Sequence, residues 1–79
     1  MEDLGNPISY LVLEKGADVY SSDGEKLGKV NKVLADEQRD IFEGILVDPM
    51  PIIPGDLKEI PADRVEAIYE RGVVIAPED

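Results

Sequence analysis

The residues that could do chemistry in this 79-residue chain are carboxylates and hydroxyls gathered in short polar segments. The stretch VYSSDGEKLGKV, residues 19–30, places two serines beside Asp23 and Glu25. Nucleophilic catalysis needs a base next to the nucleophile, and the chain contains no His, Cys or Thr. A pair of Ser22 with Lys26 is conceivable, but it lacks an oxyanion-hole motif. The sequence therefore predicts no catalytic residue, and we expect a protein that is not an enzyme.

Two acidic turns are candidates for cation binding, because Ca²⁺ and Mg²⁺ prefer carboxylate and carbonyl oxygens. The first contains Asp23 and Glu25, and the second contains Asp36, Glu37 and Asp40. Neither has the D-x-D-x-D-G spacing of a calcium loop, so solvated turns are the other interpretation. Zn²⁺ is not expected without His or Cys. We predict no metal site and no cofactor, and keep an ion- or small-ligand-binding regulatory domain that uses these turns as the alternative function.

The charge balance restricts the partners. With 18 acidic and 8 basic residues, the net charge is -10. Such a chain is poorly suited to a nucleic-acid backbone or an anionic membrane surface, and it favours a basic partner. No apolar run is long enough to span a bilayer, and the start of the chain is acidic where a secretion signal would be basic. We therefore expect a cytoplasmic protein.

Short apolar segments separated by Gly, Pro and Asp predict a small all-β domain. The expected extended segments are residues 8–13, 17–20, 26–35, 41–48, 57–61, 65–70 and 73–75. The Asp23-Gly24 and Arg71-Gly72 pairs predict tight turns. A single helical turn is expected from Pro61 to Arg64, because proline is tolerated at the start of a helix.

Two glycines make specific structural predictions. Residues 26–35 fit both helical and strand spacing, but Gly28 would weaken a helix by about 1 kcal/mol relative to Ala, which favours a strand. Gly28 then predicts a bulge or a sharp bend. Gly44, inside the strand expected at residues 41–48, predicts close approach of another backbone.

The only basic cluster contains Lys26, Lys29 and Lys32. The first interpretation is an edge strand that the lysines guard against unwanted pairing. The alternative is a small docking patch for an acidic partner.

The Pro-rich loop DPMPIIPGD, residues 48–56, combines three prolines with apolar side chains. Proline removes ladder hydrogen bonds, so the part from Pro49 to Gly55 either covers an open barrel end as a lid or presents apolar side chains to a partner. The strand expected at residues 8–13 is apolar on both faces, which favours a homodimer. The candidate interface residues are Met50, Ile52, Ile53, Tyr10 and Leu11.

The segments VYSSDGEKLGKVNKVLAD, FEGILVD and EIPADRVEAIYERGVVI together resemble the PRC-barrel domain over residues 8–76. The most specific part is the D-G-x-x-x-G-K-V hairpin, residues 23–30, and the P-A-D-R-V step at residues 61–65 comes next. The family is named for the H subunit of the photosynthetic reaction centre. It also supplies the C-terminal domain of a ribosome maturation factor, where it contacts a ribosomal protein.

This resemblance implies a small, highly bent barrel of about six strands, with no enzyme activity and no shared cofactor. It divides the chain into a flexible tail at residues 1–7, a PRC-barrel domain at residues 8–76 and a frayed end at residues 77–79. The predicted function is a non-enzymatic protein-interaction or assembly module. We expect it to self-associate as a homodimer and to bind a protein partner.

Overall fold

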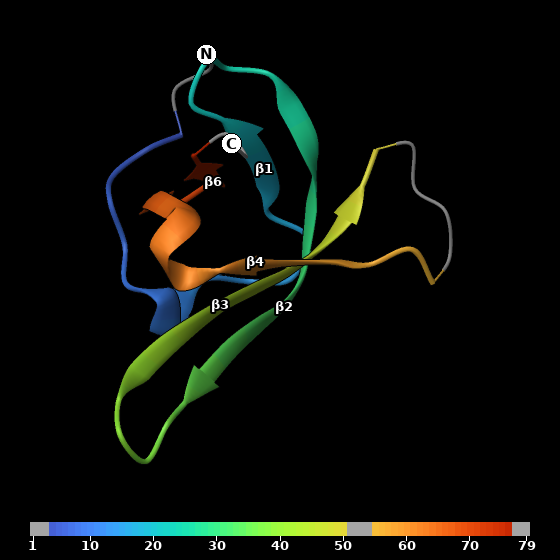
Figure 1. Ribbon diagram of the computed structural model, residues 1–79. Coiled ribbons are helices and arrows are strands. Elements are labelled where there is room, and N and C mark those ends of the chain that lie inside the picture. Colours follow the sequence, from blue (N-terminus) through green and yellow to red (C-terminus); the bar gives the residue numbers. More distant parts are fainter. Residues whose placement is uncertain (1–3, 51–54, 77–79) are drawn as a thin grey trace.

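Six strands form one strongly curved sheet in the computed structural model, which describes residues 4–50 and 55–76 (Figure 1). The elements in chain order are η1 (Tyr10–Val12), β1 (Asp18–Ser21), β2 (Lys26–Asp36), β3 (Ile41–Pro49), β4 (Lys58–Pro61), η2 (Ala62–Arg64), β5 (Val65–Tyr69) and β6 (Gly72–Ile75). The two η elements are 3₁₀ turns. The predicted all-β fold with a helical turn after Pro61 is therefore confirmed.

The strand order is β4-β3-β2-β1-β6-β5. Neighbours pair antiparallel except β1 and β6, which pair in parallel through Val19 and Val73 and the residues around them. Because β4 and β5 lie at the two ends of this order, the sheet is not closed within the described residues. The η2 turn connects these two end strands.

The long hairpin of β2 and β3 gives the sheet its bend (Figure 1). In the pairing of β1 with β2, Val19 opposes Gly28 but Tyr20 opposes Lys26, so Leu27 is an extra residue. A second register shift, between β2 and β3, leaves Asn31 as an extra residue. Such bulges bend a strand and increase its twist. The bulge predicted at Gly28 is confirmed, with the extra residue directly before it.

Glycine is required where strands approach most closely. A Cβ added to Gly28 would lie 2.2 Å from the carbonyl oxygen of Asp48. A Cβ added to Gly44, whose φ is +145°, would lie 2.2 Å from the carbonyl oxygen of Ile60. The close backbone approach predicted at Gly44 is confirmed, and the backbone it approaches is that of β4.

The core lies on the concave face of the sheet. It contains apolar side chains from five strands and from the segment before β1, which are Leu13, Val19, Val30, Ile45, Val47, Ile60, Val73 and Ile75. The alternation of strand residues places Tyr20 and Val74 on the opposite face. There they form a second, smaller apolar cluster with Leu4.

This second cluster includes the part of the N-terminal segment that the structure describes, residues 4–7 of the tail predicted at residues 1–7. Leu4 is buried against Tyr20 and Val74, and its carbonyl oxygen accepts a 2.9 Å hydrogen bond from the amide of Arg71. Pro7 forms a bridge with Tyr69. The segment is held because the outer faces of β1 and β6 are apolar and need cover from water.

The strand predicted at residues 8–13 is wrong. Residues 10–12 form the 3₁₀ turn η1, and the hydroxyl of Ser9 accepts a 3.1 Å hydrogen bond from the amide of Leu11 at its start. Such side-chain caps compete with strand pairing. Leu13 then enters the core, whereas Leu11 and Val12 remain exposed.

The interpretation of Lys26, Lys29 and Lys32 as guards of an edge strand is also wrong, because β2 lies between β1 and β3. The ammonium groups of Lys26 and Lys29 lie 3.2 and 3.3 Å from Oδ1 of Asp18 in β1. Both contacts are ion pairs. These lysines thus link neighbouring strands.

Candidate protein-binding surfaces

The first candidate surface is the η1 surface, which we define as Tyr10, Leu11 and Val12. Leu11 and Val12 are 64% and 62% exposed, the highest values among the large apolar residues described. No charged residue occurs between Ile8 and Leu13. The η1 surface is therefore an uncharged apolar patch on a strongly acidic chain.

Contacts with the β2–β3 hairpin hold this surface in place. The Tyr10 ring stacks on Phe42 with 5.1 Å between the centroids, and its hydroxyl donates a 2.6 Å hydrogen bond to Oδ1 of Asp40. That hydrogen bond is the main cause that raises the pKa of Tyr10 above its ordinary value, because the carboxylate favours the neutral phenol. Tyr10 is thus an anchor, while Leu11 and Val12 are free to contact another molecule.

The second candidate surface is a cleft of about 710 Å³, which we call the β4 cleft. It lies between the β1–β2 turn on one side, and β4 and η2 on the other, beside the end of β6. Its lining residues are Val19, Ser21, Asp23, Glu25, Leu27, Val47, Pro49, Met50, Lys58, Glu59, Ile60, Arg64, Ile75 and Ala76. The cleft therefore lies beside β4, one of the two end strands of the sheet, and beside the η2 turn that follows it.

The floor of the β4 cleft is apolar and its rim is charged. Side chains of the core, such as Val19, Val47 and Ile75, form the floor. The rim carries Asp23 and Glu25 at the β1–β2 turn, and Lys58, Glu59 and Arg64 at β4 and η2. Arg64 donates from Nη2 to the carbonyl oxygen of Ala76 at 2.9 Å, which ties η2 to the segment after β6. The cleft thus combines apolar contact area with charges that can orient a bound group.

The predicted interface residues fall on different surfaces. Tyr10 and Leu11 belong to the η1 surface, which is anchored at Phe42 near the start of β3. Met50 follows the end of β3 and lines the β4 cleft, with 49% of its side chain exposed. Ile52 and Ile53 lie outside the described residues. Of the predicted residues that the structure describes, Tyr10 and Leu11 thus lie near the start of β3, and Met50 follows its end.

The β1–β2 turn uses its polar groups for its own geometry. The amide of Gly24 donates to the carbonyl of Ser21 at 2.9 Å, and the hydroxyl of Ser21 donates to Oδ1 of Asp23. The amide of Glu25 donates to Oδ1 of Asp23 at 3.3 Å. The hydroxyl and then this amide lower the pKa of Asp23, since both stabilise the carboxylate. Asp23 is therefore ionised at neutral pH.

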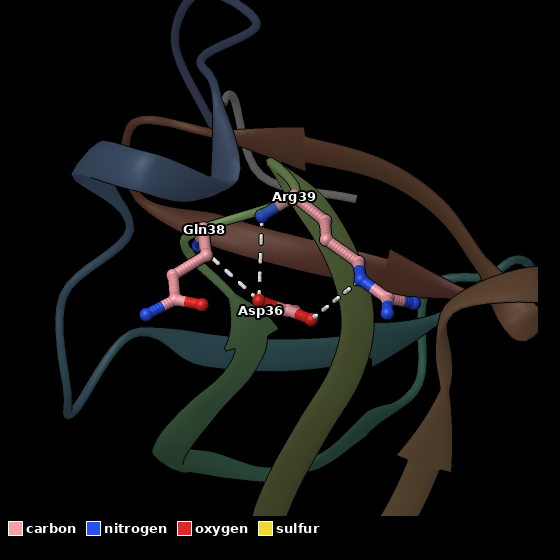
Figure 2. A network of polar contacts seen from close by, with 3 residues as sticks. All are labelled: Asp36, Gln38 and Arg39. Carbon is pink, nitrogen blue, oxygen red and sulfur yellow. Dashed lines mark hydrogen bonds and ion pairs between the residues drawn. The ribbon is translucent and has the colours of Figure 1, made fainter.

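The turn between β2 and β3 is organised in the same way around Asp36 (Figure 2). Oδ1 of Asp36 accepts hydrogen bonds from the amides of Gln38 and Arg39 at 3.2 and 3.3 Å. Its Oδ2 lies 3.8 Å from Nε of Arg39. The arrangement is an Asx-type turn, in which a carboxylate satisfies the backbone amides that follow it.

The two acidic turns do not converge on a shared point. Asp23 and Asp36 bind backbone amides, and Asp40 binds the hydroxyl of Tyr10. In the described part of the chain, no three Asp or Glu side chains lie close enough together to hold a metal ion. The geometry thus gives the ion-binding alternative no supporting observation.

Comparison with protein families supplies the deciding observation. The family description "PRC-barrel domain" matches residues 11–79, nearly the whole chain, and those residues include all six strands. The chain belongs to the PRC-barrel domain family. No curated protein matches it. In the described residues of this PRC-barrel domain, no helix is both long and apolar enough to cross a membrane.

Sequence reasoning missed the β4 cleft of this PRC-barrel domain. Arg64 and Ala76 are 12 positions apart, and the hydrogen bond between them depends on how β5 and β6 pair. Val12 was also missed as a surface residue, because an assumed strand placed it in a covered element. The available indication was Ser9, whose type favours a cap or turn over a strand.

Proposed function

We propose that this PRC-barrel domain is a non-catalytic module for protein interaction and assembly, and that it forms a homodimer through the η1 surface. The observation that carries the proposal is the exposure of Leu11 and Val12 on a firmly anchored turn. Contiguous exposed apolar patches mark interaction sites, and Leu11 and Val12 are neighbours on one turn. Family membership supports a domain of this kind.

Charge favours a second copy at this surface. Two molecules of net charge -10 repel each other wherever their acidic faces meet. The stretch from Ser9 to Leu13 has no charged residue, so Leu11 and Val12 of two copies can meet in an apolar contact. A carboxylate at this surface, that of Asp40, accepts the hydrogen bond of the Tyr10 hydroxyl. A two-fold interface uses the same patch on both subunits, which suits a short self-complementary turn. A dimer also enlarges the small apolar core of a domain of this size.

The side-chain chemistry supports a non-catalytic role. The Ser9 hydroxyl accepts from the amide of Leu11, and the Ser21 hydroxyl takes part in the β1–β2 turn. With no His, Cys or Thr in the chain, none of the three serines has an imidazole or thiolate partner, and Lys26, the base considered for Ser22, forms an ion pair with Asp18. We place the action of the protein in the cytoplasm, which its Cys-free composition is compatible with.

Light scattering coupled to gel filtration tests the proposal. The wild-type protein is expected to elute as a dimer, and the double variant Leu11→Ser with Val12→Ser as a folded monomer. Leu57→Ser is the matched control, because Leu57 is an exposed apolar residue, 42% accessible, outside the η1 surface. Circular dichroism checks that all variants fold. A wild-type protein that stays monomeric at every attainable concentration, or a dimer that the double variant leaves intact, would overturn the homodimer proposal.

A further inference from the structure

The open edge of the sheet lies beside the β4 cleft. Lys58, Glu59 and Ile60 belong both to β4 and to the lining of the cleft. One edge of β4 pairs with β3, and within the described residues no strand pairs with its other edge. A strand edge presents unpaired amide and carbonyl groups that can bind another extended chain.

We propose that the β4 cleft binds an extended segment of a partner protein that carries alternating apolar and basic residues, and that this segment adds to the free edge of β4. The inference rests on the proposed function, since it names the partner chemistry of a protein-interaction module. It concerns a different surface from the homodimer contact.

The opposite edge of the sheet shows why β4 is the edge available. Residues 6–8 lie along the outer edge of β5, where the amide of Ile8 donates to the carbonyl of Ile68 at 2.9 Å. The amide of Glu70 donates to the carbonyl of Asn6 at 3.0 Å. The chain thus covers part of its β5 edge with its own backbone. A partner strand at β4 would do the same at the other end of the sheet.

The apolar floor selects alternate side chains of the bound segment. In an extended chain, successive side chains point to opposite sides. One set would contact Leu27 and Met50, which are partly exposed in the cleft above the buried Val47. The other set would face the charged rim.

Charge complementarity favours basic residues in that second set. Asp23 and Glu25 lie on the wall of the cleft formed by the β1–β2 turn, and no Lys or Arg forms an ion pair with either of them among the described residues. Lys26 and Lys29, the nearest cations in sequence, are directed to Asp18. On the opposite wall, Glu59 offsets Lys58, and Arg64 binds the carbonyl of Ala76. The wall formed by the β1–β2 turn therefore carries two carboxylates and no cation among the lining residues. The net charge of -10 adds to the attraction of a basic segment.

Fluorescence anisotropy with synthetic peptides tests this proposal on the full chain. The probe is a labelled peptide of about eight residues, a common strand length, in which Val and Lys alternate. Matched peptides replace every Lys with Glu, or methylate alternate backbone nitrogens so that strand pairing is lost. We expect saturable binding of the Lys peptide that weakens with added salt. The Glu peptide and the methylated peptide are expected not to bind.

Variants locate the binding site. Asp23→Asn and Glu25→Gln, which keep the acceptor oxygens of the turn, should each weaken binding about two- to fivefold, as for other exposed charge pairs. Glu43→Gln and Glu66→Gln remove the same charges at exposed positions outside the cleft and should leave binding unchanged. In NMR spectra, the amides of Lys58, Glu59 and Ile60 should shift when the Lys peptide binds, and those of them that point away from β3 should become protected from exchange.

The outcomes separate this inference from the homodimer proposal. Equal binding of the Lys and Glu peptides, equal weakening by the cleft and control variants, or amide shifts confined to the η1 surface would each overturn the inference. If the protein is a dimer that binds none of the peptides, the inference fails and the homodimer proposal stands. If the protein is a monomer that binds the Lys peptide through β4, the homodimer proposal fails and the inference stands. A dimer that dissociates in the cleft variants would show that a second copy occupies the cleft, which contradicts both assignments.

Discussion

The hydroxyl of Tyr10 donates a 2.6 Å hydrogen bond to Oδ1 of Asp40, a residue 30 positions further along the chain. Together with the stacking of Tyr10 on Phe42, this bond attaches η1 to the tip of the β2–β3 hairpin. The relationship matters for function because the exposed residues of the η1 surface follow directly after Tyr10. It also makes the ionisation of a tyrosine depend on a distant carboxylate.

Replacement of Asp40 should therefore change the titration of Tyr10. The hydrogen bond to Asp40 raises the pKa of Tyr10, and the charges of Asp40 and Glu37 act in the same direction. Stability from this group is complete below its unfolded pKa of about 10 and is lost as pH rises through the folded pKa. In Asp40→Asn we expect the pKa of Tyr10 to fall, measured from its ring resonances by NMR. Glu66→Gln is the control, and an unchanged midpoint in Asp40→Asn would contradict the assignment.

The close strand contacts at Gly28 and Gly44 predict a large loss of stability on substitution. Gly44→Ala combines a Cβ clash with the backbone of Ile60 and an unfavourable φ, so it should destabilise the fold by about 2–4 kcal/mol. Gly28→Ala should cost about 1–3 kcal/mol from its clash with Asp48 alone. The control is Gly16→Ala, where φ is +95° and the added Cβ meets no atom within 4 Å.

Urea unfolding measures these differences. Gly16→Ala is expected to cost about 1 kcal/mol, from backbone strain only. Equal losses in Gly16→Ala and Gly44→Ala would show that the approach of β4 to Gly44 does not limit stability.

The contact of Asp18 with two lysines predicts a pH-dependent contribution to stability. Burial alone would raise the pKa of Asp18, but the close ammonium groups of Lys26 and Lys29 outweigh it, and the pKa is lowered. A lowered pKa stabilises the fold above the unfolded pKa, about 3.9, and this stabilisation is lost as pH falls through the folded value. Asp18→Asn should cost about 0.2–1 kcal/mol at neutral pH, because all three side chains are partly exposed.

Thermal melting at neutral pH and near pH 3 checks whether the stabilisation by Asp18 is lost in acid. The difference between wild type and Asp18→Asn should shrink in acid, whereas Asp63→Asn, at an exposed position without an ion pair among the described residues, should have little effect at neutral pH. A difference that grows in acid would contradict the ion-pair explanation.

The burial of Leu4 predicts that the N-terminal segment contributes to stability. Leu4 is 5% exposed and packs with Tyr20 and Val74, so Leu4→Ala should destabilise the fold by about 2–5 kcal/mol. Leu11→Ala, at a residue that is 64% exposed, is the matched control and should cost little stability. Chemical denaturation measures both. Similar small losses would mean that the second apolar cluster is not required for folding.

Local patterns in the sequence determined much of the fold. Gly24 after Asp23 and Pro61 before η2 set two turns, because the backbone angles they allow are properties of single residues. Gly44 indicated a close contact for the same reason, since a residue without Cβ in a strand leaves space for another backbone. Carboxylates in the polar segments take part in turns, as Asp36 shows by accepting hydrogen bonds from the amides of Gln38 and Arg39. The tight turn predicted at Arg71 and Gly72 lies one residue earlier, at Glu70 and Arg71, and Gly72 begins β6.

The tertiary structure decided what local patterns cannot contain. Apolar residues at positions 8–13 are compatible with a strand, and whether they pair depends on partners far away in the chain. Here β1 pairs with β6 in parallel, and Leu4 packs against Tyr20 and Val74 on the outer face of these two strands. Tyr10 contacts Asp40 and Phe42, and residues 10–12 form a 3₁₀ turn in place of the predicted strand. Lys26, Lys29 and Lys32 lie on a central strand and not on an edge strand, because long-range contacts set the strand order. The β4 cleft is lined by residues from five strands and from η2, so it is a property of the whole arrangement and of no single segment.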